Sequence, residues 1–269
     1  MKLIKINESQ KNRIFEAYQE GFSFEKLASI PFETNDPKAQ YKYCFKWLGR
    51  PNGQGSSRTV FTLDDNLVLK LAYSVFYNTM NNETSVLEGA GADQNRAEFE
   101  VYEKMDTSLL PRILYHDDNF TFMVCESVLP ATEEDFEKII GLPYHHRYYQ
   151  NSKQVRNILS PNSGDTIVGY NKYFDNIKAP YESSKICLID IFEYIHGKFV
   201  DRDAYVDEEL EQAIQSSPWL REFVQLAKKS NMSDYCQIEN FGIVNRDGNP
   251  TLVILDSGLN RKVWEKHYK

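Results

Sequence analysis

A lysine in an apolar run and a glutamate further along the chain have the residue types that could form a buried ion pair. Lys70 lies inside the apolar run 67–72, and Glu98 lies on the helix predicted next. A buried ammonium group needs a carboxylate partner, because an unpaired charge in the interior is costly. Taken alone, Lys70 fits equally well a solvated position on an edge strand. If Lys70 is buried, Glu98 is the candidate partner.

A second pair, Asn240 and Asp256, has the oxygen atoms that could hold a cation. Asn240 precedes the predicted strand 241–244, and Asp256 follows the predicted strand 251–255. The connecting residues 245–250 contain Asp-Gly, which predicts a β-hairpin with the two side chains next to each other at its open end. A hard cation such as Mg²⁺ prefers such oxygens. Asp256 alone is also typical of a turn former.

A glycine- and serine-rich segment precedes the strand of Lys70. Residues 53–58 read Gly-Gln-Gly-Ser-Ser-Arg and lie between predicted strands over 41–48 and 58–62. Rossmann and P-loop sites need a helix after the glycines, whereas a strand follows here. We therefore interpret the segment as a hairpin flap whose backbone N–H groups can close over phosphates. An ordinary flexible hairpin is the competing interpretation.

The elements that must position these residues form a strand-rich first half and a more helical second half. Periodicity predicts helices over 8–29, 95–105 and 219–227, with another that opens at Thr132. It predicts strands over 41–48, 58–62, 67–72, 112–116 and 120–128, and a loop over 73–92. The first three strands would form an antiparallel meander.

Composition excludes several classes of protein. The 269 residues are 41% hydrophobic and 26% charged, enough to bury a large core. A net charge of -8 has the wrong sign for coating nucleic acid. No apolar stretch approaches the roughly 20 residues that cross a bilayer, and no secretion signal is evident. The four cysteines are widely spaced, which argues against a disulfide framework or a zinc site. We expect a cytoplasmic protein with no nucleic-acid or membrane partner.

The order of these segments resembles that of the protein kinase-like family. The match runs through the glycine flap, the Lys70 strand, the Glu98 helix, a strand into Glu126, Asp234 before Asn240, a hairpin and Asp256-Ser257-Gly258. It covers about residues 45–130 and 215–260. It implies an α+β, two-lobed fold: an N-terminal helical extension over 1–34, an antiparallel β-sheet N-lobe over 35–130 and a mainly helical C-lobe over 131–269.

The resemblance also implies a role for each candidate residue. Lys70 would hold the ATP phosphates, Glu98 would orient Lys70, and Asp234 would accept the proton of the acceptor hydroxyl. The remaining residues would bind ligands: Gly53, Gly55, Ser56 and Ser57 the nucleotide phosphates, Glu126 and Val128 the adenine, and Asn240 and Asp256 the Mg²⁺. The implied function is an ATP- and Mg²⁺-dependent phosphotransferase acting on a protein or small-molecule hydroxyl.

The chain departs from that family in ways that favour an alternative. Asp234 precedes Asn240 by six positions and follows Met-Ser, whereas the family has five positions and His-Arg. Ser257 replaces the usual Phe, and the 11 residues after Gly258 are too few for an activation segment. The alternative is a degenerate, pseudokinase-like module that binds a nucleotide or a protein partner without phosphoryl transfer. A third possibility is an unrelated α+β scaffold whose motifs agree by chance.

Overall fold

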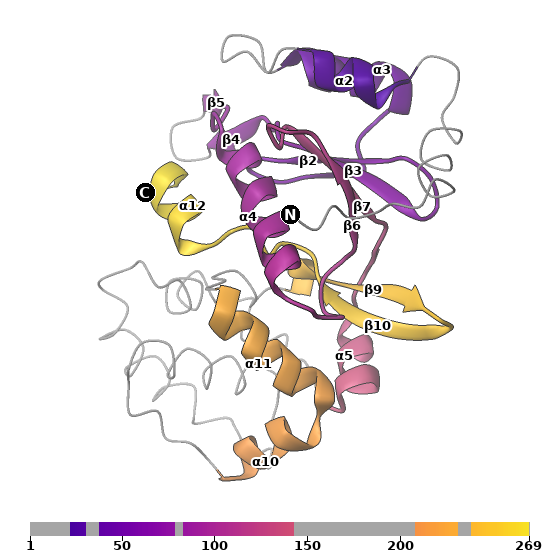
Figure 1. Ribbon diagram of the computed structural model, residues 1–269, viewed down its shortest axis with the longest axis vertical. Helices are drawn as coiled ribbons and strands as arrows, with labels where there is room; N and C mark the ends of the chain where they lie inside the picture. The colour runs from indigo at the N-terminus through magenta and orange to yellow at the C-terminus, as the bar shows by residue number, and fades with distance from the viewer. Residues whose placement is uncertain (1–21, 31–37, 79–82, 143–207, 231–237, 269) are drawn as a thin grey trace. The chain divides into compact units, whose positions relative to one another are not determined.

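The computed structural model describes residues 22–30, 38–78, 83–142, 208–230 and 238–268 (Figure 1). In these residues the chain is α+β, with antiparallel sheets and several helices. It divides into two compact units, the first from Met1–Glu103, Pro111–Ser127 and Glu265–Lys269, and the second from Lys104–Leu110 and Val128–Trp264. Among the helices of the described ranges, none combines the length and apolar character that crossing a membrane demands.

The first unit is built on a five-stranded sheet with the order β1-β2-β3-β7-β6. Its strands are β1 (Gly53–Gln54), β2 (Thr59–Thr62), β3 (Leu67–Leu71), β6 (Ile113–His116) and β7 (Phe122–Glu126). Side chains alternate between the two faces along each strand. Leu69 and Leu71 therefore point to one face of β3, and Val68 and Lys70 point to the other.

Helices cover both faces of this sheet. On one face, α2 (Phe24–Ser29) and α3 (Lys38–Leu48) form a core with Phe61, Leu69 and Phe122. On the other face, Phe99 and Tyr102 of α4 (Ala90–Lys104) pack with Ile113, Met123, Cys125 and Val68. Lys70 therefore lies on the α4 face. Residues 1–21 of the expected N-terminal extension lie outside the described residues, and its α2 part belongs to the core of the first unit.

The prediction of a strand over 41–48 is wrong, because these residues lie in α3. Alternating aromatic residues suggested a period of two, but the buried positions are Gln40 and Cys44, one helical turn apart. The helix ends at Gly49, whose φ is 80° and whose N–H donates to the Phe45 carbonyl at 3.1 Å. The strand that precedes the turn of the glycine-rich segment 53–58 is therefore β1, which lies within that segment.

The predicted loop over 73–92 contains regular structure. Strand β4 (Phe76–Asn78) pairs with β5 (Glu83–Ser85), and α4 begins at Ala90 rather than at 95. Glycine disfavours helix on propensity alone, but a close approach requires it here. A Cβ added at Gly91 would lie 2.5 Å from the Ser57 carbonyl oxygen and 2.7 Å from Ala72 Cα. Gly91 thus lets the first turn of α4 lie against the backbone of Ser57 and of Ala72, the residue after β3.

The second unit contains a three-stranded sheet, β10-β9-β8, and helices around an aromatic core. Its elements are β8 (Leu129–Pro130), α5 (Glu133–Ile140), α10 (Glu208–Ser216), α11 (Pro218–Ser230), the 3-10 helix η1 (Ile238–Asn240), β9 (Phe241–Arg246) and β10 (Asn249–Ile254). Phe136 packs edge-on against Phe241 with ring centroids 5.1 Å apart. The predicted hairpin is confirmed, since Asp247 and Gly248 both take the positive φ, 54° and 83°, that a two-residue turn needs. Helix α12 (Arg261–His267) follows and continues into the first unit from Glu265.

Candidate functional site

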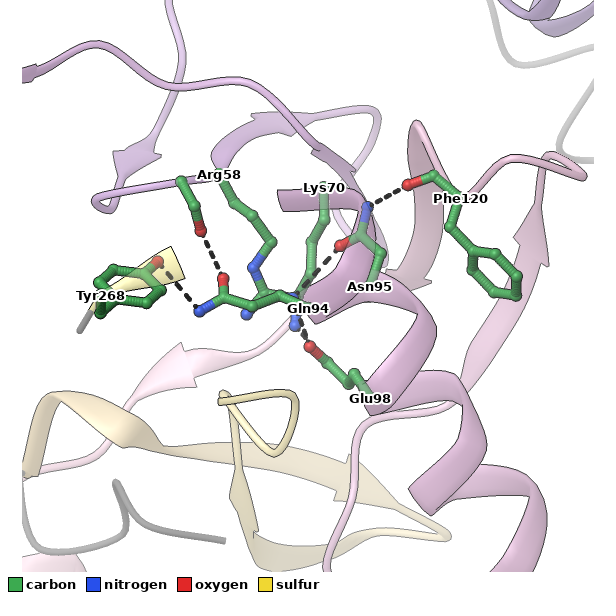
Figure 2. Close-up of polar contacts among 8 residues, drawn as sticks. Arg58, Lys70, Gln94, Asn95, Glu98, Phe120 and Tyr268 are labelled. Carbon is green, nitrogen blue, oxygen red and sulfur yellow. Dashed lines mark hydrogen bonds and ion pairs between the residues drawn. The ribbon is translucent and has the colours of Figure 1, made fainter. Parts of the chain in front are cut away.

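Lys70 is a buried cation with a carboxylate partner. Its side chain is on the central strand β3 and the residue is only 8% exposed, so the alternative of a solvated edge strand is wrong. The Lys70 Nζ donates to Glu98 Oε1 at 2.5 Å (Figure 2). Glu98 lies in the middle of α4 and is 3% exposed. The partner predicted from the sequence is therefore the residue that Lys70 contacts.

Glu98 also binds a second cation, Arg58, to which sequence analysis assigned no role. The Arg58 Nη1 donates to Glu98 Oε2 at 2.5 Å and to Asn95 Oδ1 at 3.3 Å. Each carboxylate oxygen of Glu98 therefore has its own cation. Burial alone would raise the pKa of the Glu98 carboxyl, but the charges and hydrogen bonds of Lys70 and Arg58 outweigh burial and hold that pKa below its ordinary value. Glu98 is thus ionised at neutral pH.

The glycine segment forms β1 and the turn into β2, the strand that pairs with β3. Gly53 pairs with Val60, and Val60 pairs with Lys70 on the next strand. The Gly55 N–H donates to the Arg58 carbonyl at 2.8 Å and closes the turn. We use "the glycine hairpin" for residues 53–58 from here on.

The tip of the glycine hairpin is attached to α4 by its side chains. The Ser57 Oγ donates to Gln94 Oε1 at 2.5 Å, and Arg58 binds the next turn of the same helix at Glu98. The Ser56 Oγ lies 3.0 Å from the Tyr268 hydroxyl. The tip of the glycine hairpin therefore has side-chain contacts with α4 and with Tyr268.

Asn95 connects this group to the turn between β6 and β7. It is fully buried, and its Nδ2 donates to the Phe120 carbonyl at 2.9 Å while its Oδ1 accepts from Arg58 (Figure 2). Sequence analysis missed Gln94 and Asn95. The available signal was their spacing, because residues three and four positions before Glu98 share its helix face.

The strand predicted to border the adenine ends as expected at Glu126. The Glu126 N–H donates to the Arg112 carbonyl at 2.8 Å, and its Oε2 accepts from the Arg112 N–H at 3.1 Å. Val128 begins the second unit, and its side chain would lie 2.2 Å from a Cβ added at Gly242. The adenine-binding role of Glu126 and Val128 stays a prediction.

The candidate magnesium ligands lie at the open end of the β9–β10 hairpin. The Leu255 N–H donates to the Asn240 carbonyl at 2.8 Å, which extends the pairing of Phe241 with Ile254 by one residue. Asn240 is therefore opposite Leu255, the residue before Asp256, and the contact of the Asn240 and Asp256 side chains with one cation stays a prediction. In the part of the chain that the structure describes, no group of three or more His, Cys, Asp or Glu side chains suits a metal ion. The candidate base Asp234 lies outside the described residues.

The chemistry that each unit offers can be stated separately. The first unit offers an ammonium and a guanidinium group on one buried carboxylate, next to a glycine hairpin. The second offers an amide and a carboxylate at the end of a β-hairpin. Comparisons with known proteins give no match to a family model, to a curated protein or to a solved structure.

Proposed function

We propose that this chain is an ATP- and Mg²⁺-dependent phosphotransferase of kinase-like, two-lobed fold that acts on a protein or small-molecule hydroxyl. The observation that carries the proposal is the buried Lys70–Glu98 ion pair, which joins the third strand of a five-stranded sheet to the helix that follows it. In protein kinases a lysine on the third strand contacts the nucleotide phosphates and pairs with a glutamate of the next helix. Lys70 and Glu98 have the residue types and the placement that those roles require.

The glycines of the hairpin support a ligand that approaches the backbone. A Cβ at Gly53 would lie 3.9 Å from Val60 Cβ, and a Cβ at Gly55 would lie 3.8 Å from the Arg58 carbonyl oxygen, both ordinary contacts. Neither glycine has a positive φ. The fold itself therefore does not require glycine at either position. Glycine does permit the close approach of a phosphate to the backbone.

Asn240 and Asp256 suit Mg²⁺, because both offer oxygen ligands and the β9–β10 pairing brings their backbones to adjacent positions. When bound, the ion would neutralise phosphate charge. In the proposal Lys70 binds and aligns the phosphates, Glu98 orients Lys70, and Asp234 accepts the proton of the acceptor hydroxyl.

A second candidate function is a pseudokinase-like module that binds nucleotide and does not transfer phosphate. The six-residue spacing from Asp234 to Asn240 favours it, because the base would be displaced from the position the family uses. This module would keep the Lys70 site and lose the chemical step.

Binding is tested by thermal and urea unfolding of the full chain with and without Mg-ATP. At 100 times the dissociation constant, a ligand that binds only the folded state adds about 2.7 kcal/mol of stability. We expect this stabilisation in the wild type and its loss in Lys70→Met, which keeps the apolar stem and removes the charge. If millimolar Mg-ATP leaves the unfolding of the wild type unchanged, both candidate functions are wrong.

Transfer is tested by following the γ-phosphate of labelled ATP. We expect Asp256→Asn to abolish transfer and to weaken the dependence of binding on magnesium, and Asp234→Asn to abolish transfer while binding persists. Glu239→Gln is the matched control, because Glu239 is an exposed carboxylate next to Asn240. Binding without any transfer by the wild type would favour the pseudokinase-like module.

A further inference from the structure

Residues 266–268, at the end of α12 and just after it, contact the glycine hairpin and α4. Tyr268 places its hydroxyl 3.0 Å from the Ser56 Oγ. It also accepts a hydrogen bond from Gln94 Nε2 at 3.4 Å, which Figure 2 shows. Gln94 in turn accepts from Ser57 at 2.5 Å. A closed set of hydrogen bonds therefore links the phenol, the tip of the glycine hairpin and α4.

The two residues before Tyr268 attach the same segment to the first turn of α4. Lys266 Nζ and His267 Nε2 contact Asp93 Oδ2 at 2.6 and 2.7 Å. Partial burial would raise the pKa of the Asp93 carboxyl, but the hydrogen bonds and charges of Lys266 and His267 outweigh burial and lower it. We call residues 266–268 the strap, since they hold α4 at Asp93 and the hairpin at Ser56.

The glycine hairpin needs such an external attachment. Its first strand, β1, has two residues and pairs only with β2. β1 is thus a very short edge strand of the five-stranded sheet, and its backbone pairing gives the hairpin few contacts. The ties through Ser56, Ser57 and Arg58 therefore set where the hairpin backbone lies relative to Lys70.

We propose that Tyr268 is a positioning residue for the nucleotide site: its hydroxyl holds the glycine hairpin against α4 in the conformation that receives the phosphates. This inference rests on the proposed function. A loop fixed beforehand in its binding conformation loses less freedom when the ligand binds, so affinity rises. The strap also begins only ten positions after Asp256, so one continuous stretch carries a candidate magnesium ligand and the residue that positions the hairpin.

The test uses Tyr268→Phe in the full chain, which removes the hydroxyl and keeps the ring. The matched control is Tyr115→Phe on β6, whose ring packs against Phe122 on the opposite face of the sheet from α4. The first measurement is hydrogen–deuterium exchange of the ligand-free protein over residues 53–58, with β7 as internal reference. We expect about fivefold faster exchange over 53–58 in Tyr268→Phe, the factor that the typical net contribution of one hydrogen bond implies, and no change in the control.

The second measurement is the dissociation constant for Mg-ATP. We expect it to rise by a similar factor in Tyr268→Phe, mainly through faster dissociation. Ser56→Ala should reproduce most of this rise and should add little in the Tyr268→Phe background, because both changes remove the same contact.

The outcomes separate the inference from the function on which it rests. Unchanged exchange over 53–58 in Tyr268→Phe overturns the inference, whatever the protein binds. Faster exchange with an unchanged dissociation constant also overturns it, since the strap would then be purely structural. A wild type that binds no Mg-ATP overturns the proposed function, whereas faster exchange of the hairpin in that case still supports Tyr268 as the residue that positions it.

Discussion

Replacement of Glu98 by alanine should destabilise the first unit more than any change to an exposed carboxylate. The substitution leaves Lys70 and Arg58, each 8% exposed, without the carboxylate that both contact. Removal of one partner from a buried ion pair typically costs about 3–5 kcal/mol. Since whole domains are stable by only about 5–15 kcal/mol, we expect Glu98→Ala to remove a large part of the stability of the unit.

The pH dependence of this effect has a definite sign. The pKa of Glu98 is lower in the folded protein than its ordinary value of 4.5, because the two cations outweigh burial. A depressed carboxyl pKa contributes stability above the unfolded value and loses it as pH falls through the folded value. The difference between wild type and Glu98→Ala should therefore be constant near neutral pH and should shrink below about pH 4.5.

Native-state hydrogen exchange of the β3 and α4 amides measures the opening free energy of this unit in particular. Glu103→Ala, on the exposed side of the same helix, is the matched control and should stay within about 0.5 kcal/mol of wild type. A decrease of less than about 1 kcal/mol in the opening free energy of Glu98→Ala would refute the reasoning. Removal of a buried carboxylate that contacts two cations should cost more than that.

Conversion of the whole ion network to apolar residues should behave differently. A triple variant with Arg58→Met, Lys70→Met and Glu98→Leu replaces both cations together with the carboxylate that they share. Such replacements are often neutral or stabilising, so the triple variant should recover most of the stability that Glu98→Ala loses. If the triple variant is less stable than Glu98→Ala, the network contributes net stability and this part of the reasoning is wrong.

In three further predictions, the expected result follows from one physical effect at the residue concerned. Gly91→Ala should cost about 1–3 kcal/mol in urea unfolding, because backbone atoms would have to move, while Gly53→Ala should leave stability nearly unchanged. Burial raises the pKa of the Cys44 and Cys125 thiols to about 12. In a variant with the other two cysteines replaced by serine, alkylation of these two thiols at pH 8 should therefore be slow until urea unfolds the chain. Asp135→Ala should cost about 1 kcal/mol, because its carboxylate caps the N-terminus of α5, and an unchanged urea midpoint would contradict that role.

The features that the sequence predicted correctly depend on local chemistry or on a strong energetic demand. Asp247-Gly248 specifies a hairpin by its two backbone conformations. Lys70 in a buried strand demands an anion, and Glu98 was the candidate on the following helix. Both inferences use facts that hold within a short stretch of chain or follow from the cost of burying charge.

The features that the sequence did not predict depend on contacts that form only in the folded chain. The aromatic alternation over 41–48 has the period of a strand, but the helix is selected because Cys44 packs into the core that Phe61 and Phe122 supply. The contact of Tyr268 with Ser56 joins residues 212 positions apart. Periodicity carries no information about such pairs, so only the folded arrangement reveals the strap.

Two features of the first unit are not required by its stability, and β2 pairs with the strands of both. A buried ion network can be replaced by apolar residues at little cost, and Gly53 and Gly55 occupy positions where a Cβ would meet only ordinary contacts. Val60, which pairs with Gly53, also pairs with Lys70. The proposed function would account for both features, because an anion that approaches the backbone of the hairpin would be met by the cation of Lys70 on β3. Neither a structural salt bridge nor a flexible turn alone explains why the cation and the glycines are found together.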